Sequence, residues 1–251
     1  MQNLNYLPLF INIILVAIFG LIFGSLASLI SSRLVNKQAI VFARSKCLHC
    51  HNSLHPKNLI PLFSWLWQKG KCTFCHRDIS FRYPLIESLF LLAFVATFWR
   101  NNWQINVSLL FACTIFLLLA IMVITDLEHY FIPDILPILL FVLALIIHWH
   151  NRNSLSNYFL SAGLYLLFGL AAWGFFYFTS GVDGLGIDDI KFFTVAGFLL
   201  GSKMIFLFFL LSGLFGVIFG VVWQKLKNDE TFPFAPAICL SCYICLLRIL
   251  F

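Results

Sequence analysis

The fold is decided by residues 105–134, which read INVSLLFACTIFLLLAIMVITDLEHYFIPD. The part from 105 to 124 is predominantly apolar, and about 20 such residues make a helix long enough to cross a bilayer. The run ends at Thr125-Asp126, and two more acids follow at Glu128 and Asp134. Because ionisable groups are costly inside a bilayer, this stretch predicts a membrane helix that ends at an acid-bearing boundary.

Apolar runs of the same kind occur along the whole chain, at about 7–31, 84–99, 105–124, 135–149, 157–179, 190–200, 204–223 and 234–250. Of the 251 residues, 61% are apolar and only 10% are charged. A soluble domain is about half apolar and a quarter charged, so ordinary globular, coiled-coil and disordered classes are excluded. The sequence predicts an all-α protein, a polytopic membrane helix bundle of about eight spans.

Residues 32–83 differ from the rest because they are polar and basic, with nine Lys or Arg residues and one acid, Asp78. Basic loops mark the cytoplasmic side of membrane proteins, so we expect this insertion in the cytoplasm. The net charge of +6 then reports orientation in the lipid bilayer rather than binding to nucleic acid. We expect three parts: a first span at 1–31, a cytoplasmic insertion at 32–83 and a membrane domain at 84–251.

Four of the eight cysteines form two close pairs in this insertion. Two C-x2-C motifs are separated by 21 residues, and their members are Cys47, Cys50, Cys72 and Cys75. Four thiolates in two pairs can complete a tetrahedral zinc site, whose binding energy would also fold a small polar segment. A reducing cytoplasm disfavours disulfides. Four unligated thiols remain the alternative, and three nearby histidines are rival ligands: His49, His51 and His76.

Two acid clusters lie at the ends of apolar runs, one at 126–134 and one at 183–189. The span count places both on the cytoplasmic face, where the helix ends can meet. Two close carboxylates share a proton, so one can act as a base toward water while the other protonates a peptide carbonyl. Asp126 and Asp189 are the candidate pair for such aspartic-protease chemistry. The alternative from the residues alone is that these acids are solvated loop charges.

At this point the residues match a known family. The chain resembles the bacterial type IV prepilin peptidases, bifunctional leader peptidase/N-methyltransferases of the aspartic membrane protease class. The resemblance covers about residues 20–240. Its motifs occur in the family's order: Gly24-Ser25, the paired cysteines, NLIPLFSWL at 58–66, ISFRYPLIE at 79–87, DLEHYFIPD at 126–134, the second acid loop and FPFAP at 232–236.

The resemblance implies that Asp126 and Asp189 are the catalytic acids. The family loop Gly-x-Gly-x-Gly-Asp reads Gly184-Leu-Gly186-Ile-Asp188-Asp189 in this chain. Asp188 therefore stands where the family has Gly, which adds a charge beside the pair. The family's Asn near Ser28 is also missing, and Ala235 replaces the Gly of its Pro-Phe-Gly-Pro motif.

The same resemblance implies the substrates, which are type IV prepilins and the pseudopilins of type II secretion. Their basic leader would be removed at the cytoplasmic side of the bacterial inner membrane. The new N-terminal Phe would then be methylated, with S-adenosyl-L-methionine as methyl donor. In the family the cysteine-bearing insertion accompanies methylation, and Gly70 is the candidate residue for that second activity.

Three alternatives to this bifunctional enzyme stay open from the sequence. The first is a peptidase without methylation. The second is an ion or metal carrier that uses acids at the membrane boundary, although carriers usually place ionisable groups near the bilayer midplane. The third is a non-catalytic pilus assembly factor in which Asp188 marks a decayed site.

Overall fold

The computed structural model describes residues 6–36, 39, 45–47, 49–180, 185–227 and 231–251. Over these residues the regular elements are helices, apart from two isolated β-bridges, Lys46 with Ser53 and Lys71 with Asp78. The chain divides into two compact units, Met1–Leu109 and Leu110–Phe251. The prediction of an all-α fold is confirmed.

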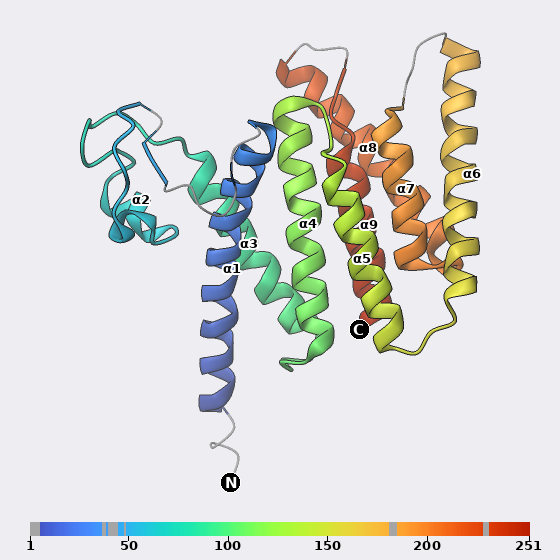
Figure 1. Ribbon diagram of the computed structural model, residues 1–251, viewed down its shortest axis with the longest axis horizontal. Helices are drawn as coiled ribbons and strands as arrows, with labels where there is room; N and C mark the ends of the chain where they lie inside the picture. The colour runs from blue at the N-terminus through green and yellow to red at the C-terminus, as the bar shows by residue number, and fades with distance from the viewer. Residues whose placement is uncertain (1–5, 37–38, 40–44, 48, 181–184, 228–230) are drawn as a thin grey trace. The chain divides into compact units, whose positions relative to one another are not determined.

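In the first unit, α1 (Tyr6–Val35) packs along α3 (Arg82–Arg100) (Figure 1). Two glycines allow this close approach, because a Cβ atom at Gly20 would lie 2.8 Å from Leu91 Cα and one at Gly24 would lie 2.7 Å from Glu87 Cα. Small residues four apart are a common means of bringing membrane helices together. The insertion between the two helices contains the 3₁₀ helix η1 (Pro56–Leu59) and the short helix α2 (Phe63–Trp67).

The second unit is built around α7, which packs against α5, α6 and α9, while α8 packs against α9. Phe192 and Phe198 of α7 are fully buried. The surrounding helices therefore shield α7 from its environment. A helix that is covered by its neighbours in this way does not need an apolar run long enough to cross a bilayer by itself. The helix bounds are α4 (Val107–His129), α5 (Ile135–His150), α6 (Leu155–Ser180), α7 (Ile187–Leu200), η2 (Ser202–Met204), α8 (Ile205–Lys227) and α9 (Ala235–Leu250).

Five of the described helices, α1, α3, α4, α6 and α8, are long and apolar enough to cross a membrane. Two shorter apolar helices, α5 and α9, accompany them. The chain is therefore a multi-pass membrane protein with five to seven apolar helices of this kind. Each of the eight predicted runs corresponds to a helix, but the count of eight spans stays a prediction.

Candidate active site and cysteine cluster

Asp126 lies in the last turn of α4 and is buried. Its Oδ2 atom accepts a hydrogen bond of 2.8 Å from the main-chain N–H of Ala235, the first residue of α9. The first amides of a helix have no partner within the helix, and the helix dipole favours negative charge there. The start of α9 therefore holds the Asp126 carboxyl group in one orientation.

Asp189 lies in the first turn of α7 and is half-buried. Its Oδ2 atom accepts a hydrogen bond of 3.2 Å from the main-chain N–H of Gly186, the residue that caps the helix. An acid at the third position of a helix often reaches back to the cap in this way. Both acids are thus anchored through one carboxyl oxygen at the N-terminus of a helix.

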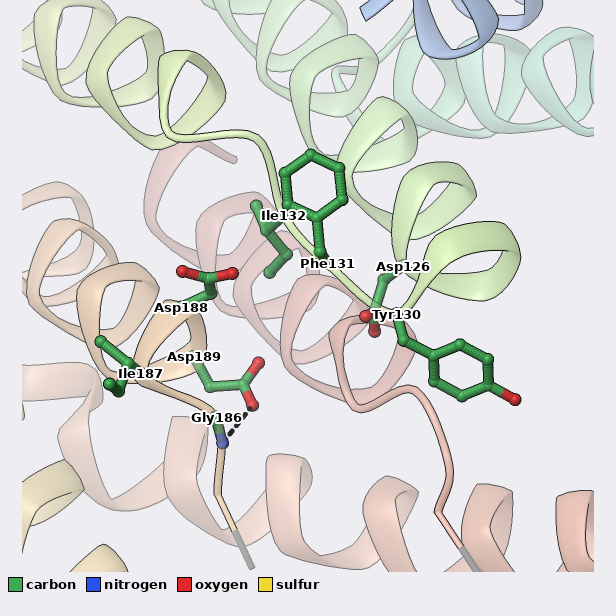
Figure 2. Close-up of a pocket in the computed structure, with 8 residues that line it drawn as sticks. All are labelled: Asp126, Tyr130, Phe131, Ile132, Gly186, Ile187, Asp188 and Asp189. Carbon is green, nitrogen blue, oxygen red and sulfur yellow. Dashed lines mark hydrogen bonds between the residues drawn. The ribbon is translucent and has the colours of Figure 1, made fainter. Parts of the chain in front are cut away.

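The two acids line the same cavity, whose volume is about 210 Å³. In Figure 2 the Asp126 side chain extends from α4 and the Asp189 side chain extends from α7 into one space. The cavity wall is completed by Tyr130, Phe131, Ile132, Gly186, Ile187 and Asp188. The structure therefore brings together the two acids that the sequence analysis selected, from positions 63 residues apart in the chain.

The surroundings of Asp189 favour a retained proton. α7 has 14 residues and is not among the five helices long enough to span a membrane, and Asp189 precedes the apolar part of that helix. Burial raises the pKa of the Asp189 carboxyl to about 7, and the neighbouring charge of Asp126 acts in the same direction. Near neutral pH the pair can therefore hold one proton between two carboxyl groups.

Asp188, the residue that departs from the family pattern, is paired with a base. Lys191 Nζ lies 3.1 Å from Asp188 Oδ1 and 2.7 Å from Asp134 Oδ1. Hydrogen bonds to Asp134 and then Asp188 raise the pKa of Lys191, so the lysine stays charged. The charge that Asp188 adds beside the cavity is therefore largely offset. Asp183 and Gly184 of the same loop lie outside the described residues.

The turn before α9 is held in place by aromatic rings on glycines of α8. A Cβ atom at Gly216 would lie 2.6 Å from Phe234 Cε2, and one at Gly220 would lie 3.3 Å from the Phe232 ring. Only glycine admits the Phe234 ring at this distance, and that ring directly precedes Ala235. The sequence analysis did not predict the hydrogen bond from the Ala235 N–H to Asp126, although the prolines of the FPFAP motif at 232–236 indicate the start of a helix.

Sequence reasoning also missed three residues of the cavity wall, Tyr130, Phe131 and Ile132. They lie inside the quoted motif at 126–134, so position in the motif was the available signal. Which way each side chain points depends on how the chain turns after α4 ends at His129.

The four cysteines of the insertion come together in the first unit. The Sγ atoms of Cys47, Cys50, Cys72 and Cys75 all lie within 4.8 Å of one another, and those of Cys47 and Cys75 are 3.9 Å apart. Sulfur ligands of one tetrahedral zinc ion lie ~3.8 Å apart, because each Zn–S bond is about 2.3 Å. All eight cysteines are free thiols. The cluster therefore fits a zinc ion, and the three nearby histidines are exposed rather than part of it.

Two turns of the same shape carry the two cysteine pairs. The N–H of His51 donates to the Cys47 carbonyl and that of His76 donates to the Cys72 carbonyl, each at 3.0 Å. Both histidines have φ of 57°. The main-chain N–H groups of Cys50 and His49 lower the pKa of Cys47 to about 6. The two turns thus hold the cysteine pairs in the same geometry, and metal binding uses the thiolate form of cysteine.

Gly70, the candidate for methylation, lies at a turn of the insertion with φ of 68°. It is buried, and a Cβ atom there would lie 3.0 Å from Trp65 Cζ2. Its carbonyl accepts a hydrogen bond from the N–H of Ile79. These contacts give Gly70 a structural role next to the cysteine cluster.

The chain is thus a helical multi-pass membrane protein of the class in which two helices bring carboxyl groups into one cavity. Residues 18–101 match the Bacterial Peptidase A24 N-terminal domain, and residues 111–221 match the Type IV leader peptidase family. The chain belongs to this leader peptidase family. The predicted resemblance and the predicted class of enzyme are confirmed.

Several relatives carry the name prepilin leader peptidase/N-methyltransferase. The chain is 36% identical over 230 residues to the one from Bacillus subtilis, with 88% of each chain covered. It is 33% identical over 218 residues to the one from Pseudomonas aeruginosa, covering 83% of this chain and 72% of the relative. It is 32% identical over 189 residues to the one from Pectobacterium carotovorum, covering 74% and 67%. No solved structure matches.

Proposed function

We propose that this protein cleaves the leader peptides of type IV prepilins and pseudopilins with Asp126 and Asp189, and then methylates the new N-terminus. The proposal locates the protein in the bacterial inner membrane, with the site on the cytoplasmic side. The observation that carries it is the shared cavity of the two acids. Family membership and the names of the relatives supply the substrate class.

The cleavage step needs one ionised and one protonated carboxyl group. The ionised group takes a proton from a water molecule, and the resulting hydroxide attacks the scissile carbonyl carbon. The protonated group donates to the carbonyl oxygen. When the tetrahedral species breaks down, the group that took the proton from water gives it to the leaving amine, and the other carboxylate recovers its proton from the hydroxyl group that becomes the carbonyl. Asp189 is suited to carry the initial proton, because its pKa is raised to about 7. Asp126 is held by the Ala235 N–H and is suited to act on water.

The ion pair of Asp188 supports the choice of Asp189 over its neighbour. Asp188 is paired with Lys191, whereas the Asp189 carboxyl accepts only a main-chain hydrogen bond from Gly186 among the described contacts. The Asp188 carboxylate is therefore already engaged in an ion pair with Lys191, which favours Asp189 as the residue that acts on the substrate. The change from the family Gly is therefore compatible with activity.

Methylation rests on the relatives' names and on the insertion. Zinc held by Cys47, Cys50, Cys72 and Cys75 would fold that insertion and take no part in the chemistry. S-adenosyl-L-methionine is then the methyl-donating co-substrate. We assign Gly70 an indirect role, in which it supports the insertion fold through its turn and its contact with Trp65.

The test is coexpression with a prepilin, followed by the intact mass of the product. Asp126→Asn and Asp189→Asn should each lower processing by at least ~1,000-fold while the membrane level of the protein is kept, because members of a catalytic unit are not replaceable one by one. Glu128→Gln is the matched control in the same segment and should retain processing. If both Asn variants still process the prepilin, Asp126 and Asp189 are not the catalytic pair. If the product is cleaved but its N-terminal Phe carries no methyl group, the protein is a peptidase without methyltransferase activity.

A further inference from the structure

The insertion carries an apolar surface that is unusual for a polar segment. Ile60, Phe63, Leu66 and Trp67 are 48%, 58%, 57% and 87% exposed. Phe63, Leu66 and Trp67 recur at spacings of three and one, which places them on one side of the short helix α2, and Ile60 lies two residues before its cap, Leu62. We call these four residues the α2 face. A clustered exposed apolar surface of this kind marks a place where something binds.

The insertion cannot move far from the membrane. α1 ends at Val35 and α3 begins at Arg82, and both helices are long and apolar enough to span a bilayer. Figure 1 shows the insertion running directly into the start of α3. Both of its ends are therefore tethered to membrane helices of the same unit.

A direct contact fixes α2 against one of those helices. The N–H of Leu62, the cap residue of α2, donates a hydrogen bond of 2.6 Å to Glu87 Oε2. Glu87 is a buried residue in the second turn of α3. The start of α2 is thus attached to a side chain in the second turn of an apolar helix that is long enough to cross a membrane.

The other side of α2 is occupied by the insertion itself. Trp65 Nε1 donates to the Ile79 carbonyl at 3.1 Å, and the Trp65 ring packs edge-on against Phe81 with centroids 5.7 Å apart. Trp65 is therefore turned into the insertion while Trp67 is turned outward. The exposure of the α2 face does not result from an unfolded segment.

The charges around the α2 face identify the kind of partner. Lys57, Lys69 and Lys71 are exposed next to it in the chain, and residues 32–83 contain nine basic residues against one acid. Tryptophan and lysine together are typical of segments that lie in the membrane interface. Basic residues there are attracted by anionic lipid.

We propose that the α2 face lies in the headgroup region of the bilayer and docks the cysteine insertion onto anionic lipid. The occupant is the lipid surface next to α1 and α3 rather than a second copy of the chain, because the tethering and the Leu62–Glu87 bond hold the face beside the first turns of α3. The docking would keep the cysteine cluster close to the place where membrane-anchored substrates emerge, and this last consequence rests on the proposed function.

The test measures where Trp67 lies in full-length protein in liposomes. Its emission is isolated as the difference between the wild type, which has seven tryptophans, and Trp67→Phe. In liposomes with anionic phosphatidylglycerol, lipids brominated near the headgroup should quench this emission by about twofold or more, whereas aqueous iodide should not. Trp65→Phe is the matched control, and the emission lost in that variant should be shielded from both quenchers.

Two other outcomes of the quenching measurement would overturn the proposal. Quenching by iodide and not by brominated lipid would show the face in water. Protection from both quenchers would show that a second copy or another protein covers it. A double variant, Phe63→Asp with Leu66→Asp, should move Trp67 from lipid to water if docking is correct. The readout does not depend on peptidase or methyl-transfer activity, so it can fail while the proposed function stands, and the reverse also holds.

Discussion

The acid site and the cysteine cluster are held together by different means. Asp126 and Asp189 are anchored at the N-termini of α9 and α7, in a unit whose helices bury Phe192, Phe198 and many other apolar side chains. In the described residues between 45 and 80, only Gly70 and Cys72 are buried. Packing of helices can therefore organise the acids, whereas the cysteine turns bury few side chains and, on the proposed function, would gain their fold from a bound metal.

Removing the metal should give the largest difference between the effect on the cysteine cluster and the effect on the acid site. Cys47→Ser or Cys72→Ser should lose zinc and lower methylation by at least about tenfold, because the insertion loses the ligand that folds it. Leader cleavage should change by less than about threefold, since the acids lie in the other unit and are held by helix ends. The measurements are metal content of the purified protein and the intact mass of the processed pilin.

Cys113→Ser is the control for this experiment, because it alters a buried cysteine of α4 outside the cluster. It should retain the metal. If cleavage fell in step with metal loss, the acid site would depend on the insertion and the comparison would be wrong.

How far the sequence predicts each region follows from what determines its structure. The apolar runs predicted the helices, because length and hydropathy determine whether a helix can lie in a bilayer. The spacing of the cysteine pairs gave the cluster, since both halves form the same local turn. The Ala235 N–H at Asp126 was not predictable, because it depends on how Phe234 packs on Gly216 of another helix. The pairing of Lys191 with Asp134 likewise depends on three-dimensional geometry, whereas the spacing of Asp188 and Lys191 on one helix permits their pair from the sequence.

A substitution in α8 should test whether helix packing positions the acid. In Gly216→Ala the new methyl group would meet the Phe234 ring at 2.6 Å, so the ring and the adjacent Ala235 N–H must shift away from Asp126. Because misplacement of a catalytic group by about 1 Å is costly, we expect kcat for cleavage to fall on the order of 10- to 100-fold with little change in KM.

Gly213→Ala provides the matched control on the same helix, because a Cβ atom there would meet no atom within 4 Å. It should leave cleavage unchanged. Equal loss in both variants would point to a general effect on α8, and no loss in Gly216→Ala would show that Asp126 does not need this contact.

The charge of Asp188 should affect the acid pair through its pKa. The cleavage step requires one shared proton, so activity should decline as pH rises through the raised pKa of Asp189, about 7. The charge of Asp188 contributes to that rise, although burial and Asp126 act more strongly. In Asp188→Asn the pKa of Asp189 should fall and the alkaline limb of the pH–activity profile should move to lower pH. The shift should be small, because Lys191 already offsets the charge.

A rate loss in Asp188→Asn as large as that of Asp189→Asn, with no movement of the alkaline limb, would reassign the catalytic acid to Asp188. Asp134→Asn is a useful comparison, since it removes the other partner of Lys191 and leaves the residues of the cavity in place. It should leave the alkaline limb unchanged or move it only slightly.

The smallest expected effect concerns Gly70 and tests the metal-dependent side of the comparison. Gly70→Ala places a side chain at φ of 68° and within 3.0 Å of the Trp65 ring, so the insertion should lose about 1–2 kcal/mol of stability. Zinc should then leave faster in a chelator competition, and methylation should fall in proportion to the metal lost. Excess zinc should restore methylation if Gly70 acts only through the fold. Methylation that stays low in zinc-saturated protein would instead place Gly70 in contact with the reacting groups.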